Sequence, residues 1–211
     1  MASYGTAILA HLFGFLALIL LLVWLLHYRE GIEYDSENAF RVFNVHPFMM
    51  FFGFIFLVGQ AILAYQTVPA THETQKIVHM TLHFIAIILG IVGICAVFKF
   101  HDMVNWADVY SFHSWIGIGT FCLFGLQWLM GVGFMLQGSA QSRSSMAQWH
   151  IAGGRAIFFM AICAALTGLM EKFTMLKVAQ RESHLINFTG LAILLFGVFV
   201  DMSLGLGGRY A

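Results

Sequence analysis

The sequence predicts an all-α membrane protein with six transmembrane helices, of which spans 2 to 5 form a four-helix bundle. Of its 211 residues, 60% are apolar and only 9% are charged, whereas a soluble domain is about half apolar and about a quarter charged. The chain has two prolines, so long helices can run without interruption. Its mean hydropathy of +0.85 excludes a disordered chain, which needs low hydrophobicity and high charge.

Six apolar stretches are long enough to cross a bilayer, whose core of about 30 Å needs roughly 20 helical residues. In chain order they are 7–26, 47–65, 77–100, 112–136, 149–170 and 185–206. The first stretch lacks the basic start and the cleavage site of a signal peptide. We therefore expect one domain over residues 1–211 in the lipid bilayer, with both termini on one side, named side I, and side O opposite.

The charges are balanced and indicate orientation only weakly. Ten Lys and Arg match ten Asp and Glu, so no basic excess indicates a nucleic-acid partner. Six basic residues belong to side O and four to side I: Arg29, Arg41, Lys99, Lys172, Lys177 and Arg181, against Lys76, Arg143, Arg155 and Arg209. By the positive-inside rule alone, side O would be cytoplasmic.

Four of the ten histidines stand where spans 2 to 5 begin. His46 and His113 lie at side O, whereas His79 and His150 lie at side I. In an up-and-down bundle, spans 2 and 4 are diagonal to each other, and so are spans 3 and 5. Each diagonal pair then holds two imidazoles at one depth, as needed to bind a flat macrocycle from both faces. The sequence predicts two haems per chain, with these histidines as axial iron ligands.

Iron held by two imidazoles has no open position for oxygen, which indicates electron transfer. His83 lies one turn after His79 on the same helix face, so it either competes for that iron or hydrogen-bonds beside it. The alternative is a divalent-metal transporter with histidine ligands, which would need carboxylates beside them in the membrane. The predicted spans contain Asp201 and no glutamate. A structural or receptor protein gives no reason for the matched depths.

Several short motifs lie in or beside spans 2 to 5. They are NVHP at 44–47, AILAY at 61–65, KIVH at 76–79, ADVYSFHSW at 107–115, QWL at 127–129 and WH at 149–150. Together they resemble the ascorbate-dependent transmembrane cytochrome b561 family, most closely its plant-type members. The resemblance covers all of spans 2 to 5, and the stretch from Tyr110 to Trp115 is its most specific part.

The resemblance implies two b haems, held by His46, His79, His113 and His150. It also implies an oxidoreductase that takes electrons from cytoplasmic ascorbate and passes them to monodehydroascorbate or ferric chelates on the other side. It places both termini in the cytoplasm, against the weak charge bias. We expect an endomembrane such as the vacuolar membrane, or the plasma membrane, and the sequence is compatible with a homodimer.

The side I substrate site needs a cation to hold the ascorbate anion and a path for the proton that its oxidation releases. Lys76 lies one turn before His79, and Arg143 lies in the predicted loop before His150. Many family members carry arginine after the tyrosine that ends span 2, but this chain has Gln66 there. The anion site is therefore expected to use other cations, with Lys76 and Arg143 as candidates.

On side O, His101 ends span 3 and faces the predicted loop that carries Tyr110. An imidazole can both hydrogen-bond a substrate and exchange its proton. The resemblance also implies a substrate-contacting histidine at this position. His101 and Tyr110 are the side O candidates.

Two charges lie deep in the membrane by residue count. Arg155 follows the side I end of span 5, and Asp201 precedes the side I end of span 6 at a similar depth. An unpaired charge there would be costly, so we expect an ion pair between them. The alternative is that Arg155 binds a haem propionate while Asp201 reaches water.

Overall fold

The computed structural model describes residues 2–137, 139–176 and 180–207. The described residues form six helical rods and contain no strand. All six rods are long and apolar enough to cross a membrane, which confirms the predicted fold class. In chain order the helices are α1 (Ala2–Val23), η1 (Trp24–Tyr28), α2 (Ala39–Met49), η2 (Met50–Phe56), α3 (Leu57–Thr67), α4 (His72–Val104), α5 (Phe112–Gln137), α6 (Ala140–Leu176) and α7 (Gln180–Leu206).

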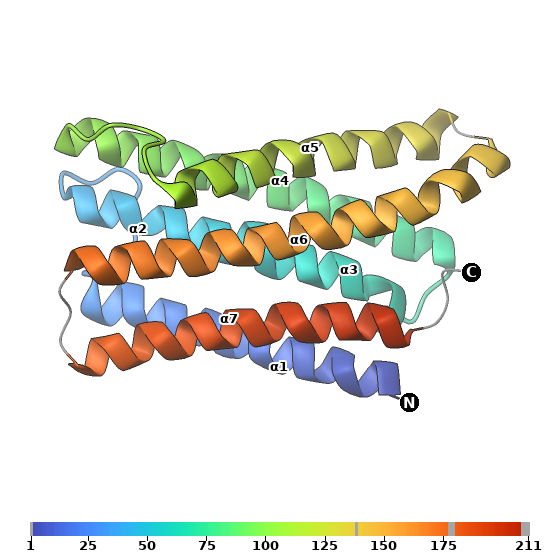
Figure 1. The fold of residues 1–211 in the computed structure, drawn as a ribbon, viewed down its shortest axis with the longest axis horizontal. Coiled ribbons are helices and arrows are strands. Elements are labelled where there is room, and N and C mark those ends of the chain that lie inside the picture. The colour runs from blue at the N-terminus through green and yellow to red at the C-terminus, as the bar shows by residue number, and fades with distance from the viewer. Residues whose placement is uncertain (1, 138, 177–179, 208–211) are drawn as a thin grey trace.

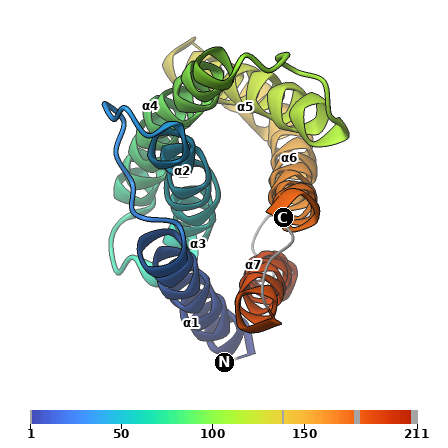
Figure 2. The same ribbon diagram turned by 90° about the vertical axis from the view of Figure 1, so that its left-hand side faces the viewer.

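The rods run up and down, and the described chain begins and ends at the same end of the molecule, side I (Figure 1). Viewed from the opposite end, side O, the rods follow one another around an elongated ring (Figure 2). Helices α2 and α3 pack on α4, α5 packs on α6, and α7 returns to pack on α1. The rods of spans 2 to 5 thus form the predicted bundle, and α1 and α7 close the ring.

The helices extend beyond the apolar stretches, so the predicted loops were too long. Helix α2 begins at Ala39 rather than at the apolar boundary, α4 continues to Val104, and α6 begins at Ala140. Polar helix ends can continue into the headgroup region, which lies outside the apolar core and leaves no hydropathy signal. As a result, His46 lies about two turns inside α2, and His101 lies in the last turn of α4.

Pro47 and a stretch of wider helix shape the second rod. Proline has no N–H, so a carbonyl of the preceding turn loses its helical partner. The rod then widens into π-helical turns over Met50–Phe56. Here the backbone approaches α4 so closely that a Cβ on Gly53 would lie 2.4 Å from the Cβ of Leu89. The widened segment also contacts α6, so it lies across the middle of the bundle.

A buried carboxylate joins α1 to α7 at side O. Glu182 lies in the first turn of α7 and is only 7% exposed. It accepts a hydrogen bond of 2.8 Å from the Trp24 indole and another from Arg29. Glu182 precedes the apolar stretch 185–206, so hydropathy alone does not reveal that it lies in this packed interface.

Near side I, α6 is tied to α7 by the expected ion pair. Arg155 Nε lies 2.6 Å from Asp201 Oδ1, and its Nη2 lies 3.0 Å from Oδ2. The guanidinium and the carboxylate therefore meet in a two-pronged arrangement, which is stronger than a single contact. The predicted pairing is confirmed.

We expect Arg155→Ala and Asp201→Ala to be coupled by about 1 kcal/mol in the free energy of unfolding. Either single variant already breaks the ion pair, so the second substitution has no ion pair left to remove. A double-mutant cycle on denaturation in a single detergent measures the coupling. Arg41 and Glu33 form the control pair. Their contact is 3.0 Å long and both side chains are exposed to solvent, so they should couple more weakly. Strictly additive losses at Arg155 and Asp201 would contradict the expectation.

Candidate functional site

Two imidazoles meet across the bundle near side O. The ring centres of His46 in α2 and His113 in α5 are 6.0 Å apart, and the ring planes are nearly perpendicular at 88°. His46 Nδ1 lies 3.0 Å from the carbonyl oxygen of Gly93, and His113 Nδ1 lies 2.8 Å from that of Ala164. An Nδ1–H that donates to a carbonyl leaves Nε2 as the ring atom able to bind a metal.

A second pair meets near side I. His79 in α4 and His150 in α6 have ring centres 6.4 Å apart. His79 Nδ1 lies 2.9 Å from the carbonyl oxygen of Ala61. His150 Nδ1 lies 3.2 Å from the amide nitrogen of Gln127, which also donates to the His150 carbonyl at 2.6 Å. The structure thus brings together both diagonal pairs that the topology predicts.

Each pair faces a cavity that is open to the outside. About 1400 Å³ of atom-free space surrounds the side O pair, and about 1670 Å³ surrounds the side I pair. Phe54 and Ala161 line both cavities and so separate them. Phe54 in turn packs on Phe121 and Phe124, with ring centres 5.2 and 5.0 Å away. The molecule therefore contains two stacked cavities with an aromatic wall between them.

The geometry of both pairs fits a haem iron. Two imidazoles on opposite faces of one iron have ring centres about 6 Å apart, because each metal–nitrogen bond is about 2 Å long. The observed separations match this value. Glycines also leave room for the rings: a Cβ on Gly168 would lie 2.7 Å from His113 Cε1, and a Cβ on Gly131 would lie 3.2 Å from His150 Cε1.

His83 lies deeper in the bundle than His79. Its ring centre is 4.3 Å from that of His79 and 5.3 Å from that of Phe124. It lines the side I cavity, and its buried Nδ1 has no hydrogen-bond partner in the described part of the chain. The ring contact that His150 makes is with His79, so the geometry favours His79 as the partner across the bundle.

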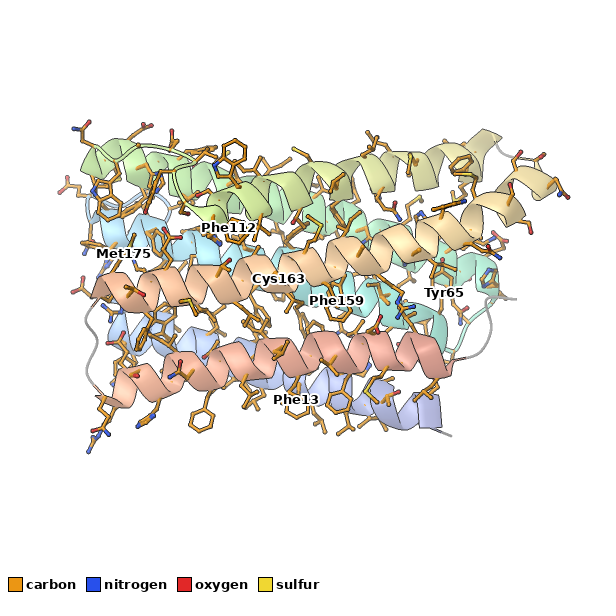
Figure 3. All side chains as sticks on the ribbon, viewed as in Figure 1. Phe13, Tyr65, Phe112, Phe159, Cys163 and Met175 are labelled. Carbon is orange, nitrogen blue, oxygen red and sulfur yellow. The ribbon has the colours of Figure 1, made fainter. Side chains whose placement is uncertain are left out.

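The candidate cations of side I have different surroundings. Lys76 lines the cavity and binds Glu73 at 2.9 Å. Arg143 lies in α6 rather than in a loop, and its side chain lies outside the described residues. Gln66 donates to the carbonyl of Ser203 at 2.8 Å and does not line the cavity. Tyr65, beside it in sequence, lies at this end of the molecule and lines the cavity (Figure 3).

The side O candidates lie together at the mouth of their cavity. His101 is 8% exposed, its Nδ1 lies 2.8 Å from Asp108 Oδ1, and its ring centre is 6.2 Å from that of Tyr110. The Tyr110 hydroxyl donates to Glu171 at 2.9 Å. Partial burial, together with the Glu171 carboxylate, raises the pKa of Tyr110 to about 12, so this phenol stays protonated at neutral pH.

Lys172, which was not predicted as a site residue, also lines the side O cavity. Its Nζ lies 3.7 Å from the ring centre of Phe43. The available signal was its spacing: Lys172 follows Gly168 by four residues, so both lie on one face of α6. Gly168 is the residue that packs on His113. The predicted span ends at residue 170, so the sequence alone does not show that Lys172 continues the same helix face as Gly168.

Comparison with known proteins places the chain among membrane electron carriers. It is 40% identical over 199 residues to the probable ascorbate-specific transmembrane electron transporter 1 of Oryza sativa subsp. japonica, with 90% of this chain and 85% of that protein covered. It is 40% identical over 208 residues to the transmembrane ascorbate ferrireductase 1 of Arabidopsis thaliana, with 95% and 87% covered. A transmembrane ascorbate-dependent reductase of Sus scrofa is 40% identical over 185 residues, with 84% and 72% covered.

The family model for eukaryotic cytochrome b561 matches residues 45–176. That range contains both histidine pairs and most of the residues that line the two cavities. The resemblance inferred from the motifs is therefore confirmed, and the chain belongs to the eukaryotic cytochrome b561 family.

Proposed function

We propose that this ascorbate-dependent transmembrane oxidoreductase carries electrons from ascorbate at side I to monodehydroascorbate or ferric chelates at side O, through two b haems. Family membership implies haem b, and the names of its relatives support ascorbate as the electron donor. The observation that carries the proposal is the stacking of two imidazole pairs along one bundle, with ring centres 6.0 and 6.4 Å apart. We further propose that side I, which carries the termini, is cytoplasmic.

Four side chains would hold the two haems: His46 and His113 near side O, and His79 and His150 near side I. Haem b, when bound, supplies an iron that takes up and releases one electron at a time. The protein holds the imidazoles in place, since three of the four have Nδ1 within hydrogen-bond distance of a backbone carbonyl. Such contacts fix the ring orientation and raise ligand basicity.

At side I, we propose that Lys76 binds the negative charge of ascorbate. Among the described residues, Lys76 and Arg155 are the only lysine and arginine that line this cavity, and Arg155 is already bound by Asp201 on two atoms. The partner of Lys76, Glu73, is 79% exposed at its side chain, so their contact is weakened by water. Lys76 can therefore exchange this partner for an anion.

At side O, we propose that His101 contacts the electron acceptor and supplies a proton when the acceptor needs one. Asp108 at 2.8 Å orients its ring. Tyr110 borders the same mouth, and its hydroxyl is held by Glu171. This arrangement would let side O return a proton with each electron that monodehydroascorbate takes up.

A reductive titration with ascorbate, followed by visible absorbance, tests the function. We expect the purified chain to be coloured and to show two resolvable haem transitions. A colourless protein that binds zinc would overturn the proposal in favour of the metal transporter. A single haem per chain would overturn the proposed stoichiometry.

Single histidine variants should sort into two groups by haem loss. His46→Ala or His113→Ala should remove the side O haem and leave the other largely loaded, and His79→Ala or His150→Ala should do the reverse. Each iron is expected to need both of its ligands. Haem content and the remaining reduction transition measure the outcome. Grouping of His46 with His150 would contradict the diagonal arrangement.

We expect Gly168→Ala to weaken haem binding at side O alone. The new Cβ would lie 2.7 Å from His113 Cε1, so the imidazole must move from its position. Gly119→Ala on α5 is the control, because a Cβ there meets nothing within 4 Å. Haem content and the side O midpoint potential are the measurements, and equal effects of the two variants would refute the steric argument.

Variants of the two substrate candidates should affect opposite sides. Lys76→Ala should slow reduction by ascorbate at side I by about tenfold, the order of effect that one well-placed charge exerts on an anion. His101→Ala should slow oxidation at side O, and neither should change haem content. Vesicles with ascorbate enclosed on a known side separate the two steps. Unchanged kinetics in both variants would make them ordinary interface residues.

A further inference from the structure

The side O cavity is lined by a lysine side chain to which the proposed mechanism gives no role. Lys172 lines this cavity. Its Nζ lies 3.7 Å from the ring centre of Phe43, 5.5 Å from that of Phe40 and 5.7 Å from that of Phe100. Three aromatic rings from α2 and α4 therefore surround the ammonium group.

An aromatic surrounding holds a cation without neutralising it. The face of a ring attracts an ammonium group through its quadrupole, but the ring carries no net charge. The six ion pairs found among the described residues do not include Lys172. The positive charge is thus fixed in position and is still available to an anion.

The nearest carboxylate in the sequence has a different partner. Glu171 also lines the cavity, and it accepts the hydrogen bond of 2.9 Å from the Tyr110 hydroxyl. Adjacent residues on a helix do not face each other, which explains why Glu171 and Lys172 make no ion pair. Tyr110 thus joins the α4–α5 loop to α6 at the carboxylate, while the lysine rests on the rings.

We propose that Lys172 selects anionic electron acceptors at side O. This inference rests on the proposed exit of electrons at that side and adds a second substrate-contacting residue to the cavity that His101 lines. In the step concerned, the reduced protein gives one electron to the acceptor, as when ferricyanide becomes ferrocyanide. Lys172 neither gains nor loses a proton or an electron. It attracts the acceptor's negative charge and so brings the acceptor close to the site of transfer.

Acceptors of opposite charge test the proposal in haem-loaded chain reconstituted with side O outward and ascorbate enclosed. Lys172→Met should raise KM for the anion ferricyanide by about tenfold, the order of effect that charge steering exerts on encounter. It should leave KM for the cation hexaammineruthenium(III) unchanged or lower. Lys172→Arg should behave like the parent, and Lys172→Gln is a second neutral variant should methionine disturb packing.

Lys99→Met is the matched control. Lys99 is also a side O lysine near a tyrosine ring, but it binds Asp35 at 3.2 Å and lies outside the cavity. The Lys99→Met variant should have the same KM as the parent for both acceptors. The absorption spectrum of every variant shows whether the haems are loaded.

Direct binding provides a readout independent of turnover. Hexacyanocobaltate(III) has the charge and shape of ferricyanide but does not accept the electron, so calorimetry can measure its binding. We expect about tenfold weaker binding to Lys172→Met and unaltered binding to Lys99→Met. Equal effects of Lys172→Met on anionic and cationic acceptors, or unaltered anion binding, would overturn the proposal.

Two further outcomes separate this inference from the proposed function. A shifted side O midpoint potential with unchanged acceptor KM would mean that Lys172 serves a carboxylate of the haem itself, and the inference would be wrong while the function stands. A parent chain that ascorbate does not reduce, or that passes electrons to neither acceptor, would overturn the function and the inference together.

Discussion

The structure depends on holding two pairs of imidazoles across a helical bundle, with ring centres 6.0 and 6.4 Å apart. If each pair holds one haem iron, as proposed, these separations allow little tolerance, because a metal–nitrogen bond of about 2 Å cannot stretch far. Each ring must therefore be positioned from its own helix. Carbonyls of α3, α4 and α6 lie within hydrogen-bond distance of the Nδ1 atoms of three rings, and the Gln127 amide contacts the fourth. Glycines on the facing helices leave room for two of them.

The irregular middle of the second rod contacts both α4 and α6 and so lies between the two imidazole pairs. The wider turns of Met50–Phe56 bring Phe54 between the two cavities, where it contacts Phe121 and Phe124. Its aromatic atoms occupy the space between the two imidazole pairs. Deep burial of Phe54, at 3% exposed, fits this position.

The number of helices and the paired histidines were predictable because they depend on the length of the apolar stretches and on the alternating direction of the spans. The Arg155–Asp201 contact was predictable because the two charges lie at matching depth and an unpaired charge there would be costly. A histidine's side of the membrane and its depth follow from counting residues along spans that alternate in direction. The helix ends were missed because polar turns extend beyond the apolar core. Lys172 and Glu182 were missed for the same reason: each lies in a helical end that hydropathy cannot distinguish from a loop.

The surroundings of Gln66 could not be predicted from its residue type. Its amide bonds to Ser3 and to Ser203, and so joins α3 to the first and last helices. A long cation at this position could extend towards the side I cavity, whereas the shorter amide is satisfied between the rods.

The two cavities therefore differ in how their lysines are held. Lys76 at side I contacts a solvent-exposed carboxylate, which an incoming anion must displace, and water weakens that contact. Lys172 at side O rests on aromatic rings, which no acceptor needs to displace. Opposite cavities of one bundle can thus attract anions by separate means. A donor and an acceptor of the same charge can then be bound at opposite ends while the membrane span between them remains apolar.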